Sequence, residues 1–537
     1  MNKKISFATF MKDFSNRHDS HYYLLLSDGK VEQIRRDDLQ CHADTLFFHD
    51  TSLLIDEFVV AKQTFPPNIA DASHLAMTIC SNEDKKTTTA RSNVARLLQS
   101  IEGTNHAAID QYLSAFWGHM ELRSSQQKLN EIVQAFLNCF KLNIIKLIED
   151  LAHQPAVNRF FSIEQPAFAV VANISVEGVL YDSRMINGIR RNVEKNLYTR
   201  IKTLSDTTNI PLCLPNEYDK TKILKQYGDE AVHVEQVDRQ IELLAATEPV
   251  LGTLADVISL RREQQIFKKI PASGSRLHPI VEIFGTTTGR IIFKDPELQN
   301  ISKVNRRIIS APPGHQFIYV DYDQFEAGIL GSLSGCADLI DLYNSRDIYE
   351  FIADSVFSDI SSRNFAKVLF LSYSYGMSVT SLKKLANKHQ LGAGVRLEKF
   401  FKRFKRIMEW KEELYSEVLS TSRISTAQAC TKYFKISDGD LSPKQRRTIV
   451  SHKVQGTGSL IFKEALVMIH SEIRPHAKIV LPMHDAFLVL CRSDKVELVT
   501  VTVVEFMKKS LKRWCPALTP KVSVSNYFSR NLQVVAD

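Results

Sequence analysis

The sequence predicts an α/β protein built from several domains. Its 537 residues suggest about three to five domains at roughly 100 to 200 residues each. Hydrophobic residues make up 44% and charged residues 24% of the chain, close to ordinary soluble domains, which excludes a disordered chain, collagen or a disulfide scaffold. Some segments have short apolar runs broken by turn residues, and others have long stretches of helical periodicity. This combination of patterns favours mixed strands and helices.

Charge and cysteine content narrow the class of protein. The chain has 68 Lys and Arg against 60 Asp and Glu, a formal charge of +8 that favours polyanionic partners such as nucleic acid, although many cytosolic proteins have similar charge. The eight cysteines are scattered, which argues against zinc ribbons and CxxC motifs and is typical of reduced thiols. Neither a signal-peptide core nor an apolar run of about 18 residues occurs. We therefore expect a cytoplasmic protein that does not enter a membrane.

The sequence patterns of the N-terminal half indicate helices and strands more clearly than they indicate a functional site. Residues 20–79 resemble a small α/β unit, because short apolar runs alternate with turn signals. The polar segment 81–91 is expected to be an exposed loop. Farther on, apolar residues recur at intervals of three and four over residues 129–151 and 239–267, which predicts a helix in each range with its apolar face in the core.

An aspartate ends a short buried strand in the C-terminal half. The apolar and aromatic run Phe317, Ile318, Tyr319 and Val320 predicts the strand, and Asp321 follows it directly. A carboxylate at the end of a buried strand is held rigidly at the edge of a sheet, which suits a metal ligand. The alternative is that Asp321 caps the helix predicted after it.

A second aspartate lies in a predicted hairpin turn. Apolar residues flank His484 and Asp485 on both sides in the segment KIVLPMHDAFLVLC, residues 478–491. Two strand-end aspartates on one sheet suit a pair of Mg²⁺ ions that stabilise the attacking and leaving oxygens of a phosphoryl transfer. Burying a carboxylate costs several kcal/mol unless it is paired or bound to metal. The two aspartates together therefore indicate a metal site more strongly than either one alone.

A predicted helix places two cations and an aromatic ring in one row. Arg363, Lys367, Leu371 and Tyr375 are spaced by four and share one face, and Gly376 is expected to end the helix. Two cations can neutralise phosphate oxygens while a tyrosine stacks near a base, which fits a nucleoside triphosphate. A solvated basic face is the alternative, but most neighbouring residues of this helix are apolar.

Five segments of the C-terminal half resemble motifs of the family A DNA polymerases, the bacterial DNA polymerase I type. Residues 321–326 (DYDQFE) resemble the palm motif DYSQIE, residues 363–378 resemble the finger-helix motif RxxxKxxxFGxxYG, and residues 483–487 (MHDAF) resemble the palm motif VHDE. Residues 285–301 (GTTTGRIIFKDPELQNI) are similar to TATGRLSSSDPNLQNIP, and residues 452–463 (HKVQGTGSLIFK) are similar to APMQGTAADIIK. The five segments occur in the family's order.

The resemblance implies a metal site and a DNA-binding surface. Two Mg²⁺ ions, or Mn²⁺ in their place, would bind at Asp321, Asp485 and the backbone of Tyr322. Primer-template DNA would be the macromolecular partner, with Arg290 and Gln455 at the minor groove. Minor-groove acceptors are shared by all base pairs, so contacts to them test pairing without reading sequence. The residues expected to contact DNA are Arg290, Gln299, Asn300, Arg447 and Gln455.

The resemblance also implies how an incoming dNTP is held. Arg363 and Lys367 would bind its β and γ phosphates, Tyr375 would stand at the templating base, and Glu326 would exclude a ribose 2′-hydroxyl. The residues expected to bind the nucleotide are Arg363, Lys367, Leu371, Tyr375, Gln324, Glu326 and His484.

Several positions depart from the family pattern. Leu371 stands where the family has Phe or Tyr, and Ser372 replaces the Gly that follows, which bears on sugar discrimination and fidelity. Ala327 and Gly328 replace the usual Leu-Arg. Ala486 replaces a Glu, which removes a third carboxylate near the metals.

The resemblance implies a right-hand polymerase of thumb, palm and fingers, preceded by a degenerate ribonuclease H-like 3′-to-5′ exonuclease domain. The expected boundaries are 1–165 for the exonuclease-like domain, 166–270 for the thumb, 271–340 for the first part of the palm, 341–447 for the fingers and 448–537 for its second part. No 5′-nuclease domain is expected within this length.

Loss of proofreading is expected because the four converging carboxylates of such an exonuclease are not evident. The expected DxE is absent from HYYLLLSDG, the expected Asp of the second motif falls near Leu53, and residues 133–140 contain no carboxylate. Asp50, Asp56 and Glu57 remain as misaligned candidates.

Taken together, the sequence predicts a DNA-directed DNA polymerase that adds dNMP to a primer 3′-hydroxyl by two-metal phosphoryl transfer, without proofreading. One alternative is a nucleotidyl transferase with altered template or sugar choice, since Leu371 leaves sugar selection open. The other is a non-catalytic nucleic-acid-binding protein. Replication of a plasmid or phage, repair and defence all remain open as biological roles, and no protein partner is indicated. The basic segment 399–406 (KFFKRFKR) fits either a nucleic-acid patch or an amphipathic helix with a solvated face.

Overall fold

The computed structural model describes residues 4–12, 20–79, 106–117, 125–150, 155–228, 237–245, 248–436 and 439–528. The loop predicted at 81–91 lies outside the described residues. Within these ranges, none of the helices combines the length and the apolar character needed to cross a membrane.

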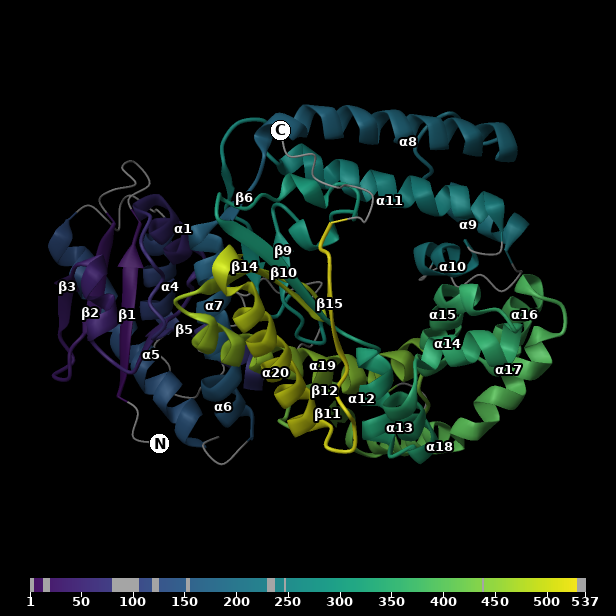
Figure 1. The fold of residues 1–537 in the computed structure, drawn as a ribbon. Coiled ribbons are helices and arrows are strands. Elements are labelled where there is room, and N and C mark those ends of the chain that lie inside the picture. The colour runs from purple at the N-terminus through teal and green to yellow at the C-terminus, as the bar shows by residue number, and fades with distance from the viewer. Residues whose placement is uncertain are drawn as a thin grey trace.

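A five-stranded mixed sheet organises the N-terminal unit, on the left of Figure 1, in the order β3-β2-β1-β4-β5. Strand β1 pairs antiparallel with β2 and parallel with β4. The sequence prediction began this unit at residue 20 and missed β1, although five of its seven residues are buried. The strands are β1 (Ile5–Met11), β2 (His21–Leu25), β3 (Val31–Ile34), β4 (Thr45–Phe48) and β5 (Ile69–Asp71). The helices are α1 (Ser52–Ala61), α2 (Ala72–Ile79), α4 (His106–Phe116) and α5 (Gln126–Asp150), and α5 confirms the helix predicted from residue 129.

A continuous helical segment leads from this unit into two long helices that run side by side across the top of Figure 1. The segment comprises α6 (Pro155–Arg159), a π-helical turn (Phe160–Glu164) and α7 (Gln165–Glu177), and the long helices are α8 (Ile186–Thr208) and α11 (Pro249–Lys269). Along the chain, α8 is followed by α9 (Glu217–Tyr227) and α10 (Val237–Leu244), which precede α11.

The single helix predicted over 239–267 is wrong, because α10 ends at Leu244 and α11 begins at Pro249. Proline has no N–H to donate inside a helix and is favoured at the first helical position.

A four-stranded antiparallel sheet lies at the centre of the molecule, in the order β13-β14-β10-β15. Its strands are β10 (His315–Tyr322), β13 (Ala477–Pro482), β14 (Ala486–Arg492) and β15 (Val522–Ser525), which confirms the predicted strand and hairpin. Helices α19 (Pro443–Ile473) and α20 (Val496–Trp514) pack against each other and against this sheet. Two small ribbons precede it, β6 (Val179–Leu180) with β7 (Arg276–Leu277) and β8 (Ile280–Glu282) with β9 (Ile292–Lys294).

A helical cluster follows β10 and lies at the lower right of Figure 1. It comprises α12 (Phe325–Ser334), α13 (Ala337–Ser345), α14 (Ile348–Ile352), α15 (Arg363–Ser374), α16 (Val379–His389), α17 (Ala393–Phe401) and α18 (Lys405–Thr421), followed by the hairpin of β11 (Arg423–Ser425) and β12 (Thr431–Tyr433). Helix α15 confirms the predicted cationic helix, and Gly376 follows its end with φ of 93°. In the segment 399–406 the phenylalanines Phe400, Phe401 and Phe404 are buried, so their side chains belong to the core.

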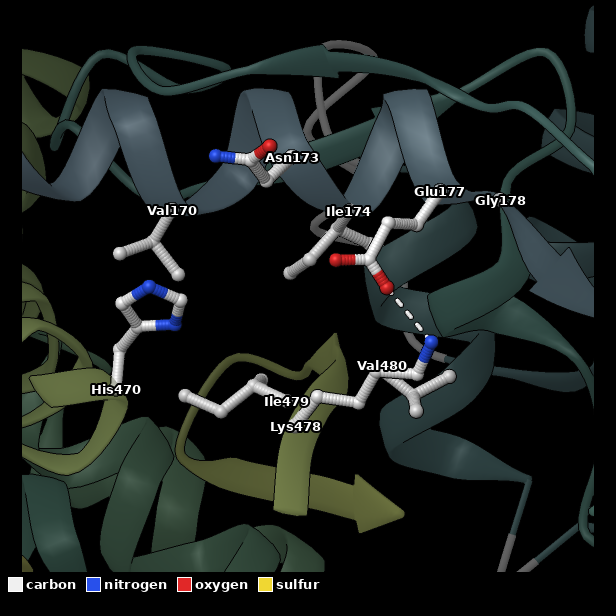
Figure 2. A pocket seen from close by; sticks show the side chains of 9 residues that line it. All are labelled: Val170, Asn173, Ile174, Glu177, Gly178, His470, Lys478, Ile479 and Val480. Atoms are coloured by element: carbon white, nitrogen blue, oxygen red, sulfur yellow. Dashed lines mark hydrogen bonds and ion pairs between the residues drawn. The ribbon is translucent and has the colours of Figure 1, made fainter. Parts of the chain in front are cut away.

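A small cavity of about 30 Å³, room for a water molecule, separates α7 from β13 (Figure 2). His470 faces it from α19, and the Glu177–Lys478 ion pair, 2.6 Å between Oε2 and Nζ, closes another side. No residue predicted to bind metal, nucleotide or DNA lines this cavity.

Gly328 provides a test of how tightly α12 packs. A Cβ added there would lie 2.8 Å from Tyr343 Cε2 and 3.1 Å from Leu518 Cδ1, so the family's larger residue has no room at this position. We expect Gly328→Ala to lower the free energy of unfolding by about 1–3 kcal/mol through overpacking. Gly188→Ala in α8 is the matched control, because no atom lies within 4 Å of its added Cβ and alanine favours a helix by roughly 0.5–1 kcal/mol. Urea unfolding followed by circular dichroism measures both; equal effects would contradict the prediction.

Candidate active site

The pairing of β10 with β14 brings the two predicted aspartates together. Asp321 lies opposite Ala486 in the antiparallel register, and the N–H of Tyr322 donates to the carbonyl of Asp485 at 3.0 Å. Asp321 does not cap the next helix, because Gln324 is the N-cap residue of α12. Residues far apart in the chain thus meet at one end of the central sheet, as predicted.

Both carboxyl groups are destabilised in their charged form. Asp321 Oδ1 is buried without a hydrogen-bond partner, and burial together with the charges of Asp485 and Asp323 raises the pKa of Asp321 to about 8. Burial also raises the pKa of Asp485, whose side chain reaches solvent yet is surrounded by protein on its other sides. The positive charge of Lys367 opposes the rise in both pKa values.

These two carboxylates fit a divalent cation. Among the residues that the structure describes, no group of three His, Cys, Asp or Glu side chains is placed to hold a metal. Mg²⁺ needs no such group, since it keeps several waters and binds through one or two carboxylates plus substrate phosphates. The unpartnered oxygen of Asp321 beside Asp485 is a site where a cation would relieve the cost of two close negative charges.

Glu326, the first acidic residue of α12, is the centre of a hydrogen-bond network. Its Oε1 accepts from Arg290 and, at 3.3 Å, from Gln455 Nε2, and its Oε2 accepts from the hydroxyl of Tyr375. Gln455 also donates to the Tyr375 hydroxyl at 3.3 Å. Four predicted site residues from four separate segments therefore share one network, which the sequence motifs alone did not indicate.

The two predicted phosphate-binding cations flank a tyrosine that the sequence analysis missed. Arg363 Cζ lies 5.6 Å and Lys367 Nζ 5.9 Å from the ring centre of Tyr349. The guanidinium of Arg363 also pairs with Asp347 at 2.7 Å. Asp347 caps α14 by accepting from the N–H groups of Tyr349 and Glu350 at 2.8 and 2.9 Å. An Asp before a short apolar run is a recognisable cap signal, but its ion pair with Arg363 depends on the tertiary fold.

The remaining predicted residues are placed in different environments. Gln324 Oε1 accepts from the N–H of Ile348 at 2.7 Å, so this side chain joins α12 to α14. Gln299 is buried and donates to the carbonyl of Pro482 at 2.6 Å, so a DNA contact would compete with an internal bond. Leu371 is half-buried, while Asn300 and His484 are exposed. Arg447 packs along the backbone at Gly376, where a Cβ would meet its Cγ at 3.6 Å.

Comparison with known proteins identifies the family. Residues 222–529, more than half of the chain, match the family described as DNA polymerase family A. The chain belongs to this family. DNA polymerase theta of Caenorhabditis elegans is 26% identical over 378 residues, which cover 65% of this chain and 23% of that protein. DNA polymerase I of Aquifex aeolicus is 26% identical over 280 residues, 48% of this chain and 46% of that protein.

This family A chain spans less than half the length of either relative. Among solved structures it is similar to the POL domain of Pol1 from M. smegmatis in complex with DNA primer-template and dNTP, with a TM-score of 0.70 and 18% identity. The likeness covers 97% of this chain and 94% of that one, and it confirms the predicted α/β polymerase fold.

Cation binding should depend on pH through Asp321. The pKa of Asp321 is about 8 in the folded chain against an ordinary 3.8. The protonated carboxyl group therefore stabilises the folded chain fully below pH 3.8, and this stabilisation is lost as the pH rises through about 8. Mg²⁺ competes with the proton for the same oxygens, so its stabilisation of the folded chain should grow as the pH rises. Thermal unfolding with and without Mg²⁺ at about pH 6 and about pH 8.5 measures this.

Asp321→Asn should lose most of the Mg²⁺ effect. Asp494→Asn is the control, since that exposed carboxylate pairs with Arg492 on the surface. An equal Mg²⁺ effect at both pH values in all three proteins would contradict a cation site at Asp321.

Proposed function

We propose that this family A chain is a template-dependent DNA polymerase that adds dNMP to the 3′-hydroxyl of a primer paired with template DNA. The observation that supports it most directly is the Asp321–Asp485 pair, two carboxylates with raised pKa values at the end of the palm-like sheet. Membership of the family and the polymerase fold give this pair its chemical context.

Asp321, Asp485 and the backbone of Tyr322 would hold the divalent cations, with Mg²⁺ as the expected species. When bound, such ions stabilise the charge on the attacking and leaving oxygens of an in-line phosphoryl transfer. The chain's own contribution is to fix the two carboxylates, because β10–β14 pairing and the Tyr322–Asp485 hydrogen bond leave them little freedom.

Helix α15 provides the cations for the triphosphate. Lys367 is exposed on the face that looks toward the aspartates, since its charge acts on both carboxyl groups. Arg363 is held by Asp347, which orients the guanidinium so that a phosphate would meet a fixed donor. No covalent nucleophile is needed, because this chemistry depends on positioning and charge stabilisation.

The Glu326 network suits recognition of the sugar and of the primer-template end. Arg290 and Tyr375 fix the Glu326 carboxylate from two sides. A carboxylate held in this way can exclude a ribose 2′-hydroxyl, and the same Arg290 and Gln455 are the proposed minor-groove contacts. We accordingly favour dNTPs over NTPs as substrates.

We propose the domain boundaries expected from the sequence, with a thumb over 166–270, a palm over 271–340 and 448–537, and fingers over 341–447. The paired helices α8 and α11 support the thumb, the central sheet supports the palm, and the helical cluster α13–α18 supports the fingers. The five-stranded N-terminal sheet supports an exonuclease-like unit over 1–165.

We also propose that this N-terminal unit has no proofreading activity. Its first strand, β1, contains no Asp or Glu, and Thr9 on β1 instead bonds the Tyr112 hydroxyl. Tyr112 stacks on Phe136 with ring centres 3.6 Å apart, and His49, at the end of β4, packs edge-on against both rings. Aromatic rings therefore fill the space beside β1 and β4, and no metal-holding group of three His, Cys, Asp or Glu side chains occurs in the described residues.

The carboxylates considered as misaligned candidates have other partners. Asp50 accepts from the N–H and hydroxyl of Ser52 at 2.8 and 2.6 Å, and Glu57 pairs with Lys12 at 3.6 Å. Asp56 also has an interaction of its own within the described residues.

Removing either palm aspartate should abolish primer extension but not DNA binding. We expect Asp321→Asn and Asp485→Asn each to lower kcat/KM for dNTP incorporation by more than about 100-fold, since changes to groups that only support metal ligands already cost 10–100-fold. Steady-state primer extension and a fluorescence anisotropy assay with primer-template measure the two properties. Asp494→Asn is the control. Full extension by either variant would overturn the proposed function.

A primer with a 3′-terminal mismatch tests proofreading. We expect the protein with Mg²⁺ to leave such a primer at full length, because no group of three His, Cys, Asp or Glu side chains is placed to hold a metal in the described part of the N-terminal unit. Denaturing gels of mismatched and matched primers, with and without dNTPs, measure this. Shortening that persists in Asp321→Asn would place a nuclease elsewhere in the chain and contradict the prediction.

A further inference from the structure

Helix α19 has a row of polar side chains along one face of its middle part. Gln455, Ser459 and Lys463 are spaced by four residues, so they follow one another down the helix. Gln455 belongs to the Glu326 network. The hydroxyl of Ser451, one turn earlier in the helix, donates to Gln455 Oε1 at 3.0 Å. Of these three residues the proposed function involves only Gln455, and it assigns no role to Ser459 or Lys463.

Ser459 and Lys463 both contact the turn that ends at Arg290. The hydroxyl of Ser459 donates to the carbonyl of Gly289 at 2.6 Å. Lys463 Nζ lies 4.3 Å from the ring centre of Phe284, at the start of the same turn. A Cβ on Gly289 would lie 3.6 Å from Ser459 Oγ and 3.8 Å from Lys463 Nζ, so the turn rests against both side chains.

The turn itself is defined by short internal hydrogen bonds. The N–H of Gly285 donates to the carbonyl of Arg290 at 2.9 Å, and the N–H of Arg290 donates to Thr286 Oγ1 at 3.0 Å. Gly289 has φ of 75°, a conformation that favours glycine. Because Arg290 is its last residue, any shift of the turn moves the guanidinium that holds Glu326.

The lower end of the row is anchored in the N-terminal half of the chain. Lys463 Nζ pairs with Glu164 Oε2 at 2.6 Å, and the two side chains are only 1% and 2% exposed. Glu164 also faces Arg159 at 3.5 Å, and Arg159 donates to the carbonyls of Thr78 and Gln428 at 2.8 and 2.7 Å. Buried charges of this kind hold a fixed geometry, because any displacement leaves a charge without its partner.

We propose that Glu164, Lys463 and Ser459 are positioning residues for nucleotide selection. They fix the turn 285–290 from beneath, so that Arg290 holds the Glu326 carboxylate in the place where it excludes a 2′-hydroxyl. The N-terminal unit thereby contributes to sugar selection in the palm without touching the nucleotide. This inference rests on the proposed function of Glu326, and its physical part, the support of the turn, is measurable on its own.

The test compares three single variants of the full chain. Ser459→Ala removes the bond to Gly289, and Glu164→Gln removes the charge that pairs with Lys463. Glu464→Gln is the matched control, because Glu464 follows Lys463 in α19 and is also buried, but its carboxylate bonds Ser510, Arg513 and Trp514 at 2.9, 2.6 and 2.8 Å, on the side of α20. A general loss of stability should affect Glu464→Gln and Glu164→Gln alike.

Two readouts separate positioning from stability. The first is hydrogen exchange of residues 285–291 in the free protein, where we expect about tenfold faster exchange in Ser459→Ala and Glu164→Gln and no change in Glu464→Gln. The second is the ratio of kcat/KM for dNTP and NTP incorporation, which should fall about tenfold in the first two variants only, since misplacement by about 1 Å can cost 100-fold.

Each result decides a separate point. Wild-type exchange at the turn in Ser459→Ala and Glu164→Gln, or equal acceleration in Glu464→Gln, overturns the support of the turn. Faster exchange with an unchanged dNTP-to-NTP ratio overturns the role in sugar selection. If the wild-type chain extends no primer, the proposed function fails and the assigned role in nucleotide selection fails with it, while hydrogen exchange still decides whether the turn is supported.

Discussion

The antiparallel pairing of β10 with β14 is the constraint on which the site depends. Two negative charges have to be held side by side in surroundings that disfavour both, as the raised pKa values of Asp321 and Asp485 show. A loop would let them move apart. Backbone hydrogen bonds along seven residue pairs prevent this, and the bond from Tyr322 N–H to the Asp485 carbonyl extends the constraint into the hairpin turn itself. Packing behind the sheet strengthens it, since Phe487 of β14 stacks on Phe462 of α19 with ring centres 4.3 Å apart.

A second constraint joins the N-terminal half of the chain to helix α19. The Arg159, Glu164 and Lys463 side chains are almost completely hidden from solvent, and burial lowers the pKa of Lys463 while the Glu164 carboxylate opposes that change. An isolated buried ammonium would be costly, so the pair is stable only when both halves of the chain are in place. Through the Glu164–Lys463 pair, the N-terminal half of the chain is thus joined to α19 whether or not it has an activity of its own.

The sequence predicted those parts of the site that depend on local pattern. Asp321 and Asp485 follow short apolar runs bounded by polar turn residues, which favour strands, and Arg363 and Lys367 share a helical face, so their elements were predictable. The network around Glu326 was not, because Arg290, Tyr375 and Gln455 meet it through tertiary packing. Tyr349 escaped notice for the same reason, as its partners lie on another helix. Strand β1 was missed because residues 5–11 lack strict alternation, and the helix over 239–267 was overextended because its apolar spacing continued across Pro249.

Ala486, where the family has Glu, adds no further carboxylate next to Asp485, and this is consistent with the electrostatic balance of the site. Ala486 is fully buried, and its carbonyl accepts from the N–H of Met483 at 2.7 Å, so a larger side chain there would disturb the turn that presents Asp485. The charges of Arg290 and Lys367 already offset part of the rise that burial and the Glu326 carboxylate cause in the pKa of Asp485. In the proposed function a triphosphate would pair with Lys367, so the positive charge of Lys367 would no longer offset the negative charges of the aspartates. Cation affinity at the site should therefore rise when the nucleotide binds, because the nucleotide adds phosphate ligands and removes a competing positive charge in the same step.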